Sequence, residues 1–274
     1  MSKTKIEYLD FTWNPLAMRC TPISEGCANC WHIQRAKMLA GNPTIPLYQR
    51  KAYAGGQPVK TYRIGDLPRH SKPLRIGIQF MGDLFHSDVP FWMIDDVFDA
   101  MLERPWHRYV LLTKRPDVLW AWLDSTGNNV DRFLKVHAIY GFTAENQATL
   151  EKRGQIMLRL KRMFHEIKIW CSLEPLLGPI SINPYVRPVC TQCNGSMSIP
   201  VPGGGKPCPR CIRNQGVDPD RLDWVIVGKE TGAGARSAKK EWFDLVISDC
   251  RNAGAPVFVK KAPEGVEIIR EYPI

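Results

Sequence analysis

Three cysteines near the start of the chain, Cys20, Cys27 and Cys30, have the spacing of metal ligands. They lie in RCTPISEGCANCW, a C-x6-C-x2-C pattern in which Gly26 is available for a tight bend before the second cysteine. Three thiolates suit a four-iron cluster that leaves one iron open to a substrate or cofactor, whereas four cysteines usually saturate a cluster for electron transfer. His32 could instead complete a Cys3His zinc site. We therefore expect an iron-sulfur cluster that takes part in chemistry, with a zinc site or unrelated buried or surface cysteines as the alternatives.

A second cysteine group follows the pattern C-x2-C-x14-C-x2-C and consists of Cys190, Cys193, Cys208 and Cys211. Four thiolates around a tetrahedral ion can fold a segment that has almost no apolar core, and this segment is rich in Pro, Gly, Lys and Arg. The pattern predicts a zinc-ribbon-like insertion over residues 188–217, with an auxiliary iron-sulfur cluster as the alternative. Its basic residues could contact a nucleic acid backbone, or the ribbon could be a structural cap.

The elements that carry these ligands follow the rhythm of repeated β/α units. Short apolar, β-branched runs alternate with stretches of helical period. We expect strands at residues 8–13, 76–80, 109–113, 136–142, 167–173, 224–227 and 257–259. We expect helices from near Trp31, after Pro90 and around residues 150–164, and a loop over residues 41–73. After Pro90, one helix face gathers Ile94, Val97, Phe98, Met101 and Leu102.

This order predicts an α/β fold, a partial or complete TIM-like β/α barrel. Residues 1–187 and 218–274 would form the barrel, and residues 188–217 the inserted zinc-ribbon-like segment. At 274 residues the chain is long enough for such a barrel and a small insertion.

Polar residues follow the expected strands, where a β/α barrel has its active-site face. They are Gly82, Asp83, Lys114, Arg115, Thr143, Glu145, Asn146, Glu174 and Glu230. The two cations could hold a carboxylate or a phosphate, and the last two glutamates could accept from an amine or a hydroxyl. Helix capping is the alternative role for Asp83 and for the polar residues at 143–146. The repeated placement predicts an enzyme.

Four stretches carry a resemblance to a known family: TWNP at residues 12–15, GCANC at 26–30, SLEPLLGP at 172–179 and VIVGKETGAGAR at 225–236. In these motifs the chain resembles the phage-associated three-Cys-motif family, a set of radical S-adenosylmethionine (SAM)-like proteins. The resemblance spans nearly the whole chain outside the cysteine-rich insertion. Radical SAM enzymes most often use C-x3-C-x2-C, so the first gap is longer here.

The resemblance implies a barrel of the radical SAM type with a [4Fe-4S] cluster on Cys20, Cys27 and Cys30. The open iron would bind the amino and carboxylate groups of SAM, one electron would cleave the sulfur-carbon bond, and the 5'-deoxyadenosyl radical would take hydrogen from the substrate. Methionine would leave as co-product, and a flavodoxin or ferredoxin would donate the electron.

The resemblance also implies roles for residues after the strands. Gly82 and Asp83 stand where the superfamily has a turn that binds the SAM amino group, and Asp83 could accept from the ammonium. Thr143, Glu145 and Asn146 stand where ribose hydroxyls and the SAM carboxylate are met in similar barrels.

Two further features have a functional and a structural interpretation. The Cys171 thiol could return a hydrogen atom to a product radical if it points into the barrel, although a buried structural cysteine is the commoner case. Lys229, Gly232, Gly234 and Arg236 form a basic loop that could approach a phosphate backbone, although Gly-rich turns after strands are common without a ligand.

The net charge of +10 makes nucleic acid the leading partner class, with solubility charge as the alternative. The proposed reaction is the modification of a nucleobase or nucleic acid, such as phage DNA, while a small molecule, a peptide or transfer RNA stays open. The rival function is a non-enzymatic, zinc-dependent nucleic-acid-binding protein. The N-terminus has no long apolar region and no apolar run suits a membrane span, so we expect a cytoplasmic protein, in the bacterial host if phage-encoded.

Overall fold

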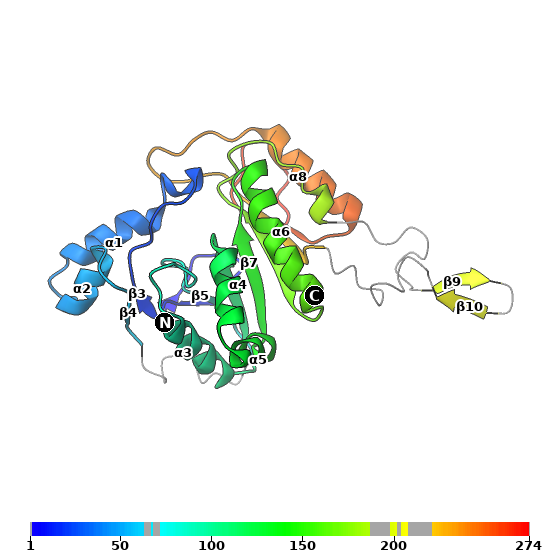
Figure 1. The fold of residues 1–274 in the computed structure, drawn as a ribbon. Helices are drawn as coiled ribbons and strands as arrows, with labels where there is room; N and C mark the ends of the chain where they lie inside the picture. Colours follow the sequence, from blue (N-terminus) through cyan, green and yellow to red (C-terminus); the bar gives the residue numbers. More distant parts are fainter. Residues whose placement is uncertain are drawn as a thin grey trace. The chain divides into compact units, whose positions relative to one another are not determined.

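The computed structural model describes residues 2–62, 67, 72–186, 198–201, 204–207 and 221–273. The contacts between residues divide the chain into two compact units. Unit 1 comprises Met1–Thr143 and Thr231–Arg236, and unit 2 comprises Ala144–Glu230 and Ser237–Ile274. Both units combine parallel strands with helices, so the fold is mixed α/β (Figure 1).

Unit 1 holds five neighbouring strands. Their order is β1 (Ser2–Lys3), β2 (Phe11–Trp13), β5 (Arg75–Ile78), β6 (Arg108–Thr113) and β7 (Ala138–Thr143), and all neighbours are parallel except the antiparallel edge strand β1. Gly77 of β5 has no room for a side chain, because a Cβ atom there would lie 2.5 Å from Leu9 Cδ1. Because β2, β5, β6 and β7 run parallel, their carboxyl ends lie at the same edge of the sheet, and the polar loops that follow them begin there.

Three helices of unit 1 follow its strands: α3 (Phe91–Leu102), α4 (Pro116–Ser125) and α5 (Gly127–Lys135). Helix α3 buries Ile94, Val97, Phe98 and Met101, which confirms the apolar face expected after Pro90, while Leu102 is half-buried. The Trp122 indole of α4 donates to Asp95 of α3 at 2.7 Å and so ties the two helices together.

A small helical hairpin lies between β2 and β5 in the sequence. Helices α1 (Trp31–Gly41) and α2 (Leu47–Tyr53) pack on each other and on the two-stranded sheet of β3 (Leu16–Ala17) and β4 (Val59–Lys60) (Figure 1). The prediction of a loop over residues 41–73 was therefore wrong for α2 and β4. The core of the hairpin consists of Ala17, Ala36, Ala52 and Tyr53, so α2 buries too few large apolar side chains to show a helical period.

Unit 2 holds three neighbouring parallel strands, β8 (Lys168–Leu173), β11 (Trp224–Val227) and β12 (Val257–Val259). Its helices are α6 (Gln147–Met163), α8 (Lys240–Ala253) and the short η3 (Asn183–Tyr185), and β9 (Ser198–Val201) pairs with β10 (Gly204–Pro207). The carboxylate of Asp249 on α8 accepts from the backbone N–H of Ile182 and Asn183 and so fixes the turn at η3.

The seven strands expected from the sequence are confirmed within three residues at their ends. Four of them run parallel in unit 1 and three in unit 2, which is compatible with a partial β/α barrel. Cys190, Cys193, Cys208 and Cys211 of the predicted zinc ribbon lie outside the described residues. Among the described residues, no helix combines the length and apolar character needed to cross a membrane.

Candidate functional site

The three-cysteine loop of unit 1 connects β3 to α1. Cys27 is buried in the short helix η1 (Glu25–Cys27), and Cys20 and Cys30 are half-buried. The Cys27 N–H donates to Ser24 O at 2.9 Å and the Cys30 N–H to Cys27 O at 3.2 Å, so consecutive turns deliver the chain to α1, which begins at Trp31. The loop is thus held by consecutive turns with hydrogen bonds between its own backbone groups.

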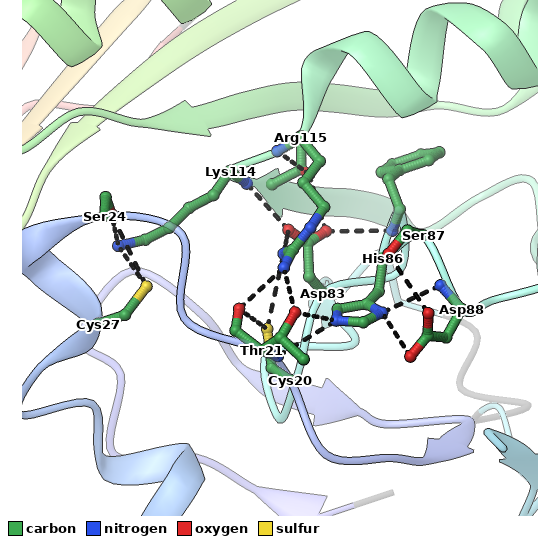
Figure 2. Close-up of polar contacts among 12 residues, drawn as sticks. Cys20, Thr21, Ser24, Cys27, Asp83, His86, Ser87, Asp88, Lys114 and Arg115 are labelled. Carbon is green, nitrogen blue, oxygen red and sulfur yellow. Dashed lines mark hydrogen bonds and ion pairs between the residues drawn. The ribbon is translucent and has the colours of Figure 1, made fainter. Parts of the chain in front are cut away.

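Two cations that follow strand β6 face two of these thiols (Figure 2). Lys114 Nζ lies 3.6 Å from Cys27 Sγ and 3.2 Å from Ser24 Oγ. Arg115 Nη1 lies 3.6 Å from Cys20 Sγ, and its Nη2 donates to Thr21 O at 2.8 Å and to Thr21 Oγ1 at 3.1 Å. Adjacent residues of one loop therefore hold two separate points of the cysteine loop.

Asp83, in the loop after β5, anchors Arg115. One carboxylate oxygen accepts from Thr113 Oγ1 at 2.7 Å and from the Phe85 N–H at 3.1 Å. The other accepts from the Lys114 N–H at 3.0 Å and from Arg115 Nη1 at 3.2 Å. These four donors fill the usual capacity of a carboxylate, and the ion pair is buried, with 8% of the Arg115 side chain and 6% of the Asp83 side chain exposed.

Two histidines hold the backbone beside Cys20. His86 Nε2 accepts from the Thr21 N–H at 3.1 Å and lies 2.8 Å from Thr21 Oγ1 (Figure 2). His32 Nε2 accepts from the Cys20 N–H at 3.3 Å, while its Nδ1 is buried without a hydrogen-bond partner among the described residues. Burial lowers the pKa of His32 to about 4, so its ring is neutral at pH 7.

The Gly-rich segment Thr231–Arg236 belongs to unit 1 and packs on the cysteine loop. The Asn29 amide donates to Gly234 O at 2.9 Å, and Arg236 Nη2 donates to Glu25 O at 3.0 Å. Gly234 has a positive φ of 74°. Gly234 and Arg236, which the sequence offered for a phosphate, are thus used to hold the loop in this structure.

The two thiols that contact Lys114 and Arg115 differ in acidity. Burial and the charge of Asp83 raise the pKa of the Cys20 thiol to about 11, although Arg115 opposes them. Burial also acts to raise the pKa of Cys27, but the Lys114 charge and hydrogen bonds from residues 23 and 24 outweigh it and leave that pKa below its usual 9.0. Cys27 is therefore the more readily ionised thiol.

The donor set of the loop fits an iron-sulfur cluster in its chemistry. Thiolates are the ligands that such clusters require, and Lys114 and Arg115 favour the ionised form of two of them. Among the described residues no three His, Cys, Asp or Glu side chains are gathered as a metal-ion site. The protons still held by these thiols would leave on metal binding.

The turn at Met81 and Gly82 is set by close packing. Gly82 has a φ of 128°, and a Cβ atom there would lie 2.8 Å from Met18 Sδ. Gln79, with a φ of 53°, is almost fully buried, and its amide accepts from the Leu16 N–H at 3.0 Å and donates to Met81 O at 2.9 Å. These contacts fix the loop that carries Asp83 to strand β3.

The polar residues predicted around β7 differ in their surroundings. Thr143, the last residue of β7, is buried. In unit 2, Asn146 caps α6 by accepting from the Thr149 N–H at 2.9 Å, and the fully buried Glu145 pairs with Arg153 of α6 at 3.0 Å. The capping role that the sequence left open is therefore present at Asn146.

Three strand ends meet within unit 2. Glu174, after β8, accepts from Lys260 Nζ, after β12, at 2.8 and 3.1 Å. Gly228, after β11, packs against this carboxylate, since a Cβ atom there would lie 3.3 Å from Glu174 Cδ. Glu230 is buried. An ion pair thus stands at the carboxyl edge of these three strands.

Cys171 of β8 is fully buried within unit 2. Burial raises its pKa well above 9.0; Glu145 and the Cys250 thiol of α8 act in the same direction, and Arg153 of α6 opposes them. These surroundings are those of a buried structural cysteine.

Sequence reasoning missed Thr21, Gln79 and His86, which make contacts within unit 1 around the cysteine loop, and Lys260 of unit 2, the ion-pair partner of Glu174. Lys260 obeys the rule that charged residues follow strands and could have been found by it. The other three act through contacts between segments far apart in the sequence, for which the sequence carries no local signal.

Comparison with known proteins gives a family. Residues 3–268 match the family described as Protein of unknown function (DUF5131). The chain belongs to this family. No curated protein and no solved structure matches the chain. The DUF5131 match covers both units, so the cysteine loop and the strand ends of unit 2 are parts of one family pattern.

Proposed function

We propose that this DUF5131 protein is a radical SAM enzyme that holds a [4Fe-4S] cluster on Cys20, Cys27 and Cys30. The observation that carries the proposal is the pairing of two loop thiols with the adjacent cations Lys114 and Arg115. A cluster with thiolate ligands carries negative charge that must be compensated when it is buried, and Lys114 and Arg115 place positive charge beside two of the thiols. The resemblance to three-Cys-motif radical SAM proteins supports the same assignment.

When bound, the cluster and SAM together supply an organic radical that removes a hydrogen atom from the substrate. The residues of this chain position and charge-balance that chemistry. Lys114 and Arg115 stabilise the thiolates, and Asp83 holds Arg115 in place because four donors of the chain fix its carboxylate. We propose that the turn at Gly82 and the Lys114 side chain lie against the polar groups of SAM.

For the residues of unit 2 we propose separate roles. Glu145 and Asn146 organise the start of α6 through Arg153 and the helix cap. Glu174 and Glu230 are proposed acceptors for an amine or hydroxyl of a ligand, with Lys260 orienting Glu174. In the cysteine-rich insertion, Cys190, Cys193, Cys208 and Cys211 are proposed zinc ligands, by their spacing.

The test is electron paramagnetic resonance on protein purified without oxygen, reconstituted with iron and sulfide, and reduced. A reduced four-iron signal that changes on adding SAM is expected for the wild type. Cys27→Ala should lose the signal and about four irons per chain. Cys250→Ala should keep both, because Cys250 is a buried cysteine of α8 in unit 2 and is not part of the C-x6-C-x2-C pattern.

A variant with Cys190 and Cys193 changed to Ala separates the two cysteine groups. The SAM-sensitive signal should persist in it, since the proposal assigns that signal to the loop of unit 1. A colourless protein that holds two zincs and gives no signal would reject the proposal and favour the rival function, a zinc-dependent nucleic-acid-binding protein.

A further inference from the structure

The positive charge of unit 1 is concentrated around the hairpin of α1 and α2. Residues 26–62 contain Arg35, Lys37, Arg50, Lys51 and Lys60 and no Asp or Glu, so they carry half of the net charge of +10. Lys60 is paired with Asp96 of α3. Arg35, Lys37 and Lys51 are exposed.

Large apolar side chains are exposed beside these cations. Trp31 and Met38 of α1 are 58% and 64% exposed, and Leu47 and Tyr48 of α2 are 59% and 53% exposed. Trp31, Arg35 and Met38 are spaced four and three residues apart and so share one stripe of α1. Leu47 and Lys51 repeat this spacing on α2, with Tyr48 beside them. We call these exposed faces the hairpin surface.

The inward side of the hairpin already has its packing partners. His32 and Ala36 of α1 and Ala52 and Tyr53 of α2 are buried, and three of these four form the small core with Ala17. The aromatic residues of the hairpin surface are therefore not needed for folding. Their mixture with cations fits a ligand that offers both flat apolar faces and negative charge.

We propose that the hairpin surface binds single-stranded nucleic acid, with Trp31 and Tyr48 stacking on bases and Arg35, Lys37 and Lys51 contacting phosphates. Stacking on side chains requires unstacked bases, which favours a single strand over a duplex. An anionic membrane is less suitable, because an interfacial helix needs a continuous apolar face, whereas the exposed apolar side chains of α1 and α2 are interspersed with Arg35, Lys37 and Lys51.

The position of Trp31 connects this surface to the cysteine loop. Trp31 is the first residue of α1 and directly follows Cys30, so a strand stacked on it lies next to the loop. As a statement about substrate the inference rests on the proposed function, and it names the substrate class as nucleic acid. The binding itself depends only on the charge and exposure of the hairpin surface.

The test measures binding by the full chain of fluorescein-labelled 12-nucleotide DNA, of RNA with the same sequence and of the matching DNA duplex. The single strands should bind more tightly than the duplex. Trp31→Ala and Tyr48→Ala should each raise Kd about tenfold. The double variant Arg35→Gln/Lys51→Gln should reduce the slope of log K against log salt by about 1.4, or about 0.7 for each lost phosphate contact.

Matched controls separate this surface from general charge. Lys5→Gln/Lys152→Gln removes the same charge at exposed sites elsewhere, and Trp106→Ala removes another exposed tryptophan. Both should leave Kd within about twofold. Equal losses in controls and hairpin variants would overturn the proposal, as would tighter binding of phosphatidylserine vesicles that depends on Trp31 and Tyr48. The single strand, DNA or RNA, that binds with the lower Kd identifies the nucleic acid of the substrate class.

The outcome is independent of the cluster test. Binding is measured on protein purified without iron and on reconstituted protein, and circular dichroism confirms that each variant is folded. Strand binding without a SAM-sensitive signal would leave this inference standing and reject the radical function. A SAM-sensitive signal with unchanged strand binding in the hairpin variants would reject this inference and leave the radical function standing.

Discussion

Asp83 and Arg115 form a buried ion pair in which each group depends on the other. Removing one charge from such a pair leaves the second uncompensated, which typically costs about 3–5 kcal/mol. We expect Asp83→Asn to lower the free energy of unfolding by about 3 kcal/mol, as measured by urea titration. Asp131→Asn provides the control, because its pair with Lys135 is 69% and 65% exposed and should change stability by less than about 1 kcal/mol. Equal effects would show that the Asp83 contacts do not hold Arg115.

Lys114 offers a residue-scale test of the proposed cluster. A positive charge beside a ligating thiolate stabilises the reduced, more negative state of a cluster. Replacing Lys114 by Gln should therefore lower the midpoint potential of the reconstituted protein, measured by redox titration, whereas Lys114→Arg should stay close to the wild type. A potential that does not respond to either change would place the cluster away from Lys114 or exclude it.

At the scale of elements, the loop between β5 and α3 is fixed to β3 by close contact at Gly82. Ala at this position would combine an unfavourable positive φ with a Cβ atom 2.8 Å from Met18 Sδ. We expect Gly82→Ala to destabilise the protein by about 2 kcal/mol or more in thermal or urea unfolding. Gly127→Ala is the control, since a Cβ atom there meets nothing within 4 Å, and it should be neutral or slightly stabilising. If both changes were neutral, the contact between β3 and this loop would not matter for stability.

The strands could be predicted because their apolar runs are continuous and bounded by polar residues, as at residues 109–113 and 224–227. Helix α2 could not be predicted, because its buried positions are Ala52 and Tyr53 and its seven residues show no apolar period. The cations Lys114 and Arg115 were found by their place after a strand. The cysteines were also found, but their pairing with these cations was not, since the contacts span 87 and 95 residues of sequence.

At the scale of the whole molecule, charge and burial are distributed unevenly. Residues 26–62 carry exposed cations without acids, while buried acids are paired with cations in both units, as in Asp83 with Arg115 and Glu145 with Arg153. The surface is therefore suited to polyanions, and the buried charges hold loops and helix starts in place. Several thiols and phenols among the described residues are also buried and remain neutral at pH 7.

These buried neutral acids determine how the stability of the protein depends on pH. Burial raises the pKa of the Cys171 and Cys250 thiols and of the Tyr109 and Tyr140 phenols. The folded protein then retains protons that the unfolded chain releases above about pH 9, so the unfolded state is favoured as the pH rises. Lys161 acts in the opposite direction, because burial lowers its pKa despite the pairing with Asp223.

We therefore expect the free energy of unfolding, from urea titrations, to fall between pH 8 and pH 10. Each fully buried thiol contributes a loss of about 1.4 kcal/mol over this interval, because the unfolded thiol titrates near pH 9. Cys250→Ala should be less stable than the wild type at pH 8 because of the lost packing, but it should lose about 1.4 kcal/mol less between the two pH values. The difference between the two slopes cancels the packing cost. Parallel slopes in the wild type and the variant would mean that Cys250 ionises in the folded protein as it does in the unfolded chain, which the complete burial of its side chain on α8 does not allow.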